Sequence, residues 1–210
     1  MLLQLPLSYI WQPANVSSRT LVVVLHGRGD SAAGFRWFQD ELAIDSLNLL
    51  LLDAPNQYYT GYSWYDSSNR LPCILESRRI LDEVFTRLEQ QGCSPDHTFL
   101  LGFSQGCLMT LEFGARYRRA LAGYVGINGY SHNPDKLLHE LNPEVNQGNW
   151  LVTHGTQDEM LAIERTRKQM QTLNAGGFRI DYREYEKSHT VDLKRELPDI
   201  REWITARLRE

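Results

Sequence analysis

The stretch LLGFSQGCLMTLEFGARY, residues 100–117, carries the strongest structural signal in the chain. Residues 102–106 within it have the form G-x-S-x-G, with Ser104 at the centre. An apolar run precedes this segment, and apolar residues at helical spacing, Leu108 and Leu111, follow it. Where a strand turns sharply into a helix, glycines are needed on both sides of the turn and the serine hydroxyl is held exposed above the sheet. The stretch therefore predicts a serine nucleophile; the alternative is a glycine-rich helix start with an ordinary serine.

Apolar runs alternate with segments of helical periodicity along the whole chain. Most of these runs are apolar enough for burial on both faces, which is typical of parallel strands. Strands are predicted at residues 20–25, 48–54, 98–102, 121–128, 150–154 and 178–185, with an edge strand in the N-terminal MLLQLPLSYIWQP. Amphipathic helices are predicted around residues 80–88, 108–113, 163–173 and 197–208. Right-handed crossovers place helices on both faces, so we predict one α/β domain, residues 1–210, with a doubly wound, mostly parallel sheet.

A serine hydroxyl needs a base within hydrogen-bond reach and a carboxylate that orients the base. In a strand–turn–helix site of this kind the expected chain order is serine, acid, histidine. Asp158 follows the strand predicted at 150–154, and His189 lies in the loop before the last helix, so both belong to the same sheet edge as Ser104. Glu159 and Asp192 are rival acids. Asp158 could instead cap a helix, and His189 could be an ordinary exposed histidine.

The other histidines fit the role of the base less well. His97 precedes its strand and so belongs to the opposite edge of the sheet, and His132 and His139 follow the wrong strand. His26 precedes the serine and His154 precedes the acid, which breaks the expected chain order. We interpret these last two as structural.

Attack on an acyl carbonyl creates an oxyanion that two backbone amides can stabilise. One is the amide of Gln105, the residue after the serine. The other is predicted in LHGRGDS, residues 25–31, where Arg28 follows a buried strand between two glycines. The same letters contain the cell-adhesion tetrapeptide R-G-D-S, but that role requires an export signal, and the N-terminal stretch lacks the cationic start and cleavage site of one.

Composition narrows the classes of partner. The net charge of −4 gives no basic footprint for nucleic acid, and no run approaches the roughly 20 apolar residues of a membrane span. Three cysteines cannot all pair within one chain, which favours a reducing cytoplasm. No cluster of histidine, cysteine and carboxylate has metal-ligand spacing. We expect a small-molecule or lipid-like acyl ester substrate, neither metal nor organic cofactor, and no integral membrane segment; the oligomeric state stays open.

Five segments together carry a family resemblance: LHGRGD (25–30), SWYD (63–66), GFSQG (102–106), HGTQD (154–158) and SHT (188–190). In this order and spacing the chain resembles the carboxylesterase/phospholipase family that includes the acyl-protein thioesterases, which are α/β-hydrolases of nearly minimal size with little or no lid. The resemblance spans about residues 20–205. It implies Ser104 as nucleophile, Asp158 and His189 as its partners, and the amides of Arg28 and Gln105 as oxyanion donors, in agreement with the interpretation from the residues themselves.

The chain also departs from the family pattern. Leucine is common in the family at position 28, glycine at position 107, and a D-P-x-V-P segment where this chain has DEMLA, residues 158–162. Residues 56–77 are expected to form a long loop whose apolar side chains could line an acyl pocket; the alternative is that about half of them pack onto the sheet. The candidates are Tyr58, Tyr59, Trp64, Leu71, Ile74 and Leu75. We expect a serine hydrolase of carboxylic esters or thioesters. The alternatives are a lysophospholipase or acyl-protein thioesterase with long-chain preference, and a non-catalytic binding module on the same fold.

Overall fold

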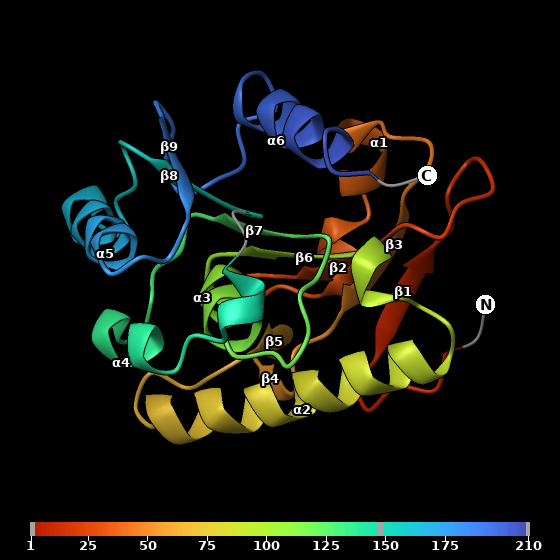
Figure 1. Cartoon of the computed structure of the whole chain (residues 1–210), viewed down its shortest axis with the longest axis horizontal. Coiled ribbons are helices and arrows are strands. Elements are labelled where there is room, and N and C mark those ends of the chain that lie inside the picture. The colour runs from red at the N-terminus through yellow and green to blue at the C-terminus, as the bar shows by residue number, and fades with distance from the viewer. Residues whose placement is uncertain (1–2, 147–148, 209–210) are drawn as a thin grey trace.

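The computed structural model describes residues 3–146 and 149–208, and it is built around a twisted seven-stranded sheet (Figure 1). The strand order is β1-β3-β2-β6-β7-β8-β9, with every neighbouring pair parallel except the edge strand β1, which runs antiparallel to β3. The strands are β1 (Tyr9–Gln12), β2 (Leu21–Leu25), β3 (Asn48–Leu52), β6 (Thr98–Phe103), β7 (Gly123–Ile127), β8 (Trp150–Gly155) and β9 (Asp181–Tyr185). This is the predicted doubly wound, mostly parallel arrangement.

Helices cover both faces of the sheet, because successive side chains of a strand point to opposite sides (Figure 1). In β2, Leu21, Val23 and Leu25 belong to one buried cluster and Val22 and Val24 to the other. The first cluster packs against α2 (Arg70–Gln90), α3 (Gln105–Gly114), α4 (Pro134–His139) and α5 (Ile163–Ala175). The second packs against α1 (Phe38–Leu42) and α6 (Glu196–Thr205), which lie together on the other face.

The N-terminal strand and the last strand start later than predicted. Of the N-terminal stretch only Tyr9–Gln12 is a strand, and residues 1–2 lie outside the described residues. The last strand starts at Asp181 rather than 178. The Asn174 side chain bonds the backbone N–H and C=O of Ile180 at 2.9 and 3.1 Å, and Phe178 packs edge-on against Trp150. Because the backbone groups of Ile180 already have hydrogen-bond partners in the Asn174 side chain, they do not pair with a neighbouring strand, and β9 begins only at Asp181.

The prediction of a long loop over residues 56–77 was wrong. The chain forms a hairpin there, β4 (Asn56–Tyr58) and β5 (Gly61–Ser63), and α2 already begins at Arg70. Ile74, Ser77 and Leu81 are buried at helical spacing, and the Ser77 hydroxyl donates to the Trp64 carbonyl at 2.5 Å. The first turns of α2 were hidden from the sequence pattern because their buried face includes a serine instead of an apolar residue.

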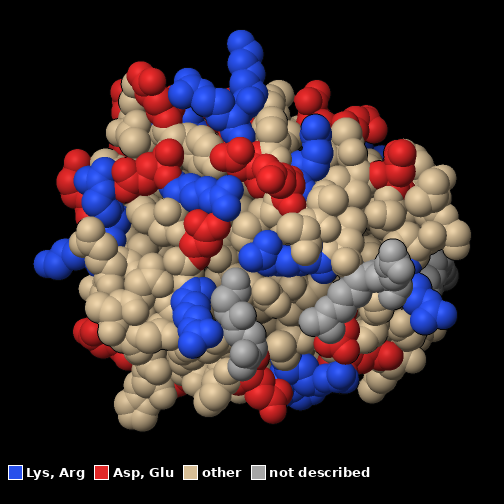
Figure 2. All heavy atoms as spheres, turned by 45° about the horizontal axis from the view of Figure 1, so that its top comes forward, with Lys and Arg blue, Asp and Glu red and all other residues tan. Residues whose placement is uncertain are grey.

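The surface mixes charges of both signs. Figure 2 shows Lys and Arg interspersed with Asp and Glu over the face in view, in keeping with the small net charge of −4. None of the helices within residues 3–146 and 149–208 is long and apolar enough to span a bilayer.

Candidate active site

Ser104 stands at a sharp turn between β6 and α3. Its φ and ψ of 55° and −112° lie in a region that residues other than glycine rarely adopt. The flanking glycines make the turn sterically feasible: a Cβ at Gly102 would lie 2.1 Å from the Gly106 carbonyl oxygen, and one at Gly106 would lie 2.0 Å from that of Leu25. The Ser104 amide donates to the Ile127 carbonyl at 2.9 Å, which fixes the turn to the neighbouring strand.

Three side chains form a continuous hydrogen-bonded chain at the carboxyl edge of the sheet. His189 Nε2 lies 2.9 Å from Ser104 Oγ, and His189 Nδ1 lies 2.7 Å from Asp158 Oδ2. The Asp158 side chain is fully buried, and that of His189 is 12% exposed. The structure thus brings together the three residues that chain order predicted, although they are separated by up to 85 positions in the sequence.

Asp158 is held in place by several hydrogen bonds. Its Oδ1 accepts the amides of Met160 and Leu161, each at 2.9 Å, and its Oδ2 accepts Asn128 Nδ2 at 2.8 Å. Burial alone would raise the pKa of Asp158, but the hydrogen bond to His189 and the Leu161 amide outweigh it and keep the pKa below its ordinary value. A buried carboxylate that remains ionised in this way can hold the imidazole in one orientation.

The two rival acids lie elsewhere. Glu159 is exposed, one residue after Asp158 in the same turn. Asp192 Oδ1 accepts the backbone amide of Lys194 at 2.8 Å in the segment that leads into α6. The described contacts of the Asp192 side chain therefore stabilise the loop before α6.

A buried polar network behind Asp158 was missed at the level of the sequence. Asn128, at φ 50°, also donates to the Ser188 carbonyl at 3.2 Å and accepts from Lys187 Nζ. Lys187 Nζ in turn lies 2.6 Å from both carboxylate oxygens of Glu196, and both side chains are almost fully buried. Burial lowers the pKa of Lys187, while Glu196 opposes the shift. The sequence did not indicate that Lys187 is buried, because this lysine lies in the polar stretch EKSHT, residues 186–190.

The loop that contains Arg28 is fastened to the β4–β5 hairpin. The Gly29 amide, at φ 83°, donates to the Tyr62 carbonyl at 2.8 Å, and the Tyr62 amide donates to the Asp30 backbone carbonyl at 2.8 Å. Gln105 fastens the other side: its Oε1 accepts the Trp64 amide at 3.0 Å. Within the described chain, the backbone amides of Arg28 and Gln105 have no acceptor. Two unpaired donors beside Ser104 can bind an oxyanion.

A cavity of about 490 Å³ opens above Ser104. Its walls include the polar and aromatic side chains of Arg28, Tyr58, Tyr65, Arg70 and Tyr130 and the apolar side chains of Phe103, Met160 and Leu161. Of the side chains predicted to line an acyl pocket, only Tyr58 lies on these walls.

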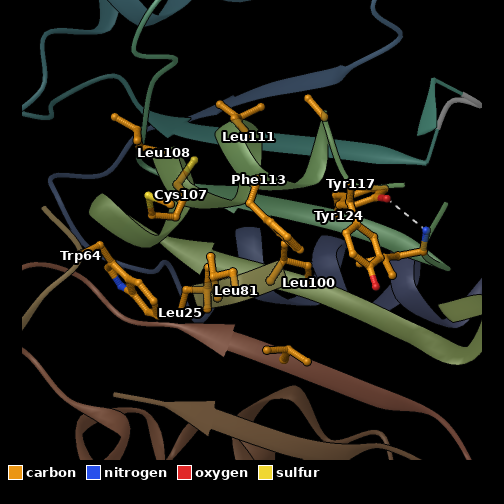
Figure 3. Close-up of a cluster of buried hydrophobic side chains, with 14 of the residues drawn as sticks. Leu25, Trp64, Leu81, Leu100, Cys107, Leu108, Leu111, Phe113, Tyr117 and Tyr124 are labelled. Atoms are coloured by element: carbon orange, nitrogen blue, oxygen red, sulfur yellow. Dashed lines mark hydrogen bonds between the residues drawn. The ribbon is translucent and has the colours of Figure 1, made fainter. Parts of the chain in front are cut away.

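The assignment of Trp64, Leu71, Ile74 and Leu75 to the acyl pocket is therefore corrected. Trp64 lies in the buried cluster drawn in Figure 3. Ile74 is buried in the same cluster, and the Trp64 indole donates to the His26 carbonyl at 2.9 Å. Leu71 and Leu75 are 41% and 45% exposed on the outer side of α2. The physical reason is the early start of α2, because a helix turns these side chains to different sides whereas a loop could direct them all inward.

Two other histidines are buried near the site. His26 Nδ1 donates to the Gly27 carbonyl at 2.6 Å, and its Nε2 accepts the Ala54 amide at 3.1 Å. His154 Nε2 donates to the Leu161 carbonyl at 2.9 Å and so supports the turn that carries Asp158. Both contacts agree with the interpretation of these histidines as structural. No three His, Cys, Asp or Glu side chains of the described residues gather at metal-binding distances.

Comparison with known proteins places this chain in a family. The family model for phospholipases and carboxylesterases matches residues 9–208. The chain belongs to the phospholipase/carboxylesterase family. Acyl-protein thioesterase 1 of Yarrowia lipolytica is 26% identical over 94% of this chain and 96% of its own length. Carboxylesterase SOBER1 of Arabidopsis thaliana is 26% identical over 91% and 92%.

Solved structures of similar proteins agree with this fold. The crystal structure of Arabidopsis thaliana SOBER1 superposes with a TM-score of 0.80 at 23% identity, over 92% of this chain and all of that one. The crystal structure of esterase PE8 gives 0.80 at 25% identity, over 96% and 99%. This member of the phospholipase/carboxylesterase family is thus an α/β-hydrolase and an enzyme of the carboxylic ester hydrolase class.

Proposed function

We propose that this enzyme cleaves carboxylic esters, and thioesters by the same route, through a covalent acyl-enzyme with Ser104 as nucleophile, His189 as base and Asp158 as orienting acid. The observation that supports the proposal most strongly is the hydrogen-bonded chain of 2.9 and 2.7 Å that links the three side chains. The serine at its head faces a cavity large enough for a small ester.

The proposed reaction has two steps. In the first, Ser104 Oγ attacks the acyl carbon as its proton passes to His189 Nε2, and the amides of Arg28 and Gln105 stabilise the oxyanion. The imidazolium then protonates the leaving alcohol or thiol, and the acyl-enzyme remains. In the second step His189 takes a proton from water, the hydroxide oxygen attacks the acyl carbon, and Ser104 leaves with a proton from the imidazolium. No step requires a metal or an organic cofactor.

A second candidate function, hydrolysis of long-chain acyl esters or thioesters, has its own observation. A groove of about 460 Å³ lies on the other side of His189, with Phe35, Trp37, Phe103, Val191 and Leu193 on its walls. Trp37 and Leu193 are partly exposed there, so an acyl chain placed in the groove would cover apolar surface. Relatives named acyl-protein thioesterase 1 are in accord with this candidate.

Active-site labelling tests the proposal and also its rival, a non-catalytic binding module on the same fold. The wild type should react stoichiometrically with a fluorophosphonate probe and hydrolyse small 4-nitrophenyl esters. Ser104→Ala should do neither while it unfolds at the wild-type temperature, because the hydroxyl fills no core space. Ser68→Ala, an exposed serine bonded to Asp66, is the matched control and should be labelled normally. Esterase activity in folded Ser104→Ala, or an unreactive wild type, would disprove the mechanism.

Two further expectations stand as proposals. We propose that the chain is one domain, since the two buried clusters lie on the two faces of one sheet; residues 1–2, 147–148 and 209–210 lie outside the described residues. We also propose the cytoplasm as its location. The support is that Cys73, Cys93 and Cys107 are all free thiols.

A further inference from the structure

Two arginines stand on the wall of the cavity that contains Ser104. Arg28 comes from the loop after β2, and Arg70 is the first residue of α2, so the two guanidinium groups reach the cavity from separate elements. Within the described chain neither has a carboxylate within 4.0 Å, whereas Arg79, on the outer side of the same α2, is paired with Glu76 at 2.8 Å. Neither cavity arginine is therefore held in a salt bridge within the described residues.

Tyrosine rings hold both guanidinium groups in place. Arg28 Cζ lies 5.4 Å from the centre of the Tyr58 ring, and its Nη1 donates to Ser67 Oγ at 3.3 Å. Arg70 Cζ lies 5.8 Å from the centre of the Tyr65 ring. Such cation–π contacts restrict the side chain before a ligand arrives, so less conformational entropy is lost on binding.

Arg70 has in addition an unsatisfied polar atom. Its Nε is buried and has no hydrogen-bond partner in the described structure, which is rare for a buried donor and costs free energy. An acceptor supplied by a ligand would satisfy it. A guanidinium presents its donors as a planar fork that fits the oxygens of a carboxylate or a phosphate.

The acidic side chains nearby do not occupy this place. Asp30 shares the cavity wall, but its Oδ1 accepts the backbone amide of Ser31 at 2.8 Å. Asp66, next to Ser67 in the sequence, is exposed and accepts the amide and hydroxyl of Ser68 at 2.8 and 2.9 Å. Both carboxylates are thus engaged in their own turns.

From these contacts we infer that the preferred esters carry an anionic group, a carboxylate or a phosphate, which Arg28 and Arg70 bind beside Ser104. The inference rests on the proposed function and names its substrate class. A buried anionic group needs paired charge, which the two guanidinium groups can supply.

Two matched pairs of esters test the inference. The first pair places a carboxylate on the acyl side: the 4-nitrophenyl monoester of adipic acid against 4-nitrophenyl hexanoate. The second places a phosphate on the leaving group: the acetyl ester of glycerol 3-phosphate against glycerol monoacetate. The measured quantity is the ratio of kcat/KM for the anionic ester to that for the neutral one. The wild type should favour the anionic ester in at least one pair, and that pair identifies the group bound.

The variants then assign the preference to the two arginines. Arg70→Met should lower the ratio about tenfold, the usual effect of a lost charge-assisted hydrogen bond, and Arg28→Leu with Arg70→Met should remove the preference. Arg79→Met, which removes the same charge outside the cavity, is the control and should keep the wild-type ratio. The preference should also shrink as salt is added. Thermal unfolding checks that each variant is folded.

The outcomes separate this inference from the proposed function. A wild type that favours neutral esters in both pairs, or a ratio that Arg70→Met and the double variant leave unchanged, overturns the inference. In either case labelling of Ser104 by a neutral fluorophosphonate shows that the proposed function stands. An unlabelled wild type that hydrolyses none of the four esters overturns both.

Discussion

At the residue scale, the orientation of His189 depends on one carboxylate. Asp158→Asn replaces an oxygen that accepts His189 Nδ1–H with an amide that can stabilise the wrong tautomer, so kcat should fall by about four orders of magnitude. Steady-state kinetics on a small ester measure this. Glu159→Gln at an exposed position and Asp192→Asn in the loop before α6 are the matched controls and should change kcat little. If Asp192→Asn is the crippling change, the acid has been misassigned.

A second residue-scale prediction concerns the backbone N–H of Arg28. Arg28→Leu keeps this amide, whereas Arg28→Pro removes it, so the two variants differ in the oxyanion donor. Loss of one such donor typically costs about a hundredfold to a thousandfold in kcat. We expect kcat of Arg28→Pro on a neutral ester to lie below that of Arg28→Leu by about this factor, with near-UV dichroism as evidence of folding. Equal values in two folded variants would mean that the second donor lies elsewhere.

The sequence could predict residues whose positions follow from chain order and strand ends, but not residues whose contacts depend on how a loop folds. Ser104, Asp158 and His189 were predicted from a chain order and a sheet edge, and in the structure these side chains make contacts of 2.9 and 2.7 Å. Lys187 and Glu196 form a buried ion pair that depends on how the loop before α6 folds back on itself. No periodicity encodes such a contact, because a lysine in a polar loop is exposed in most proteins.

At the element scale, the packing of α3 on β7 depends on a cysteine opposite a glycine. Figure 3 shows Cys107 on α3 in the buried cluster, and a Cβ at Gly126 on β7 would lie 2.6 Å from its Sγ. Burial raises the pKa of this thiol to about 12, so it acts as a small apolar side chain. The chain thus accommodates the Cys107 side chain because glycine stands across the interface.

This pairing predicts a compensating double substitution. Gly126→Ala alone should cost about 1–3 kcal/mol of unfolding free energy from overpacking, and Cys107→Ala alone about 1 kcal/mol from the lost buried atom. Together they should cost clearly less than the sum, because without Sγ the nearest atom to the new methyl is Val152 Cγ2 at 3.5 Å. Urea unfolding of the four proteins in the cycle measures the coupling, expected near 1 kcal/mol or more. Strict additivity would contradict the packing argument.

Elements were predicted best where the hydrophobic pattern was complete. The strands β2, β3, β6 and β8 lie within one or two residues of the predicted ranges, because each is apolar on both faces. The hairpin and the first turns of α2 were missed since their contacts are polar: Gln105 Oε1 binds the Trp64 amide and the Ser77 hydroxyl binds the Trp64 carbonyl. The acyl-pocket assignments failed for the same reason, as they assumed a loop.

At the scale of the whole molecule, two buried histidines make the stability of the fold depend on pH. His26 follows β2, and His154 lies near the end of β8, both at the sheet edge that carries the active site. The neutral form is required at both positions: His26 Nε2 accepts the Ala54 amide, and His154 Nδ1 is buried with no partner that could accept a proton from it. Burial lowers the pKa of both histidines, against smaller opposing effects from backbone hydrogen bonds and nearby carboxylates.

This requirement predicts how stability depends on pH. Because the folded pKa values lie below the ordinary histidine value of about 6.5, the unfolded chain binds more protons at acidic pH, so the unfolding free energy should be level above about pH 7 and fall as the pH drops through 6.5. Each histidine contributes a slope of up to about 1.4 kcal/mol per pH unit.

Urea unfolding between about pH 5 and 7.5 measures the slope, in a range where carboxylates such as Asp158, whose pKa is lowered, stay ionised. His26→Gln and His154→Gln should each make the slope shallower, whatever their cost at neutral pH, while His139→Gln, at an exposed position, should leave it unchanged. A wild-type slope retained in both buried variants would show that other groups govern the acid sensitivity of the fold.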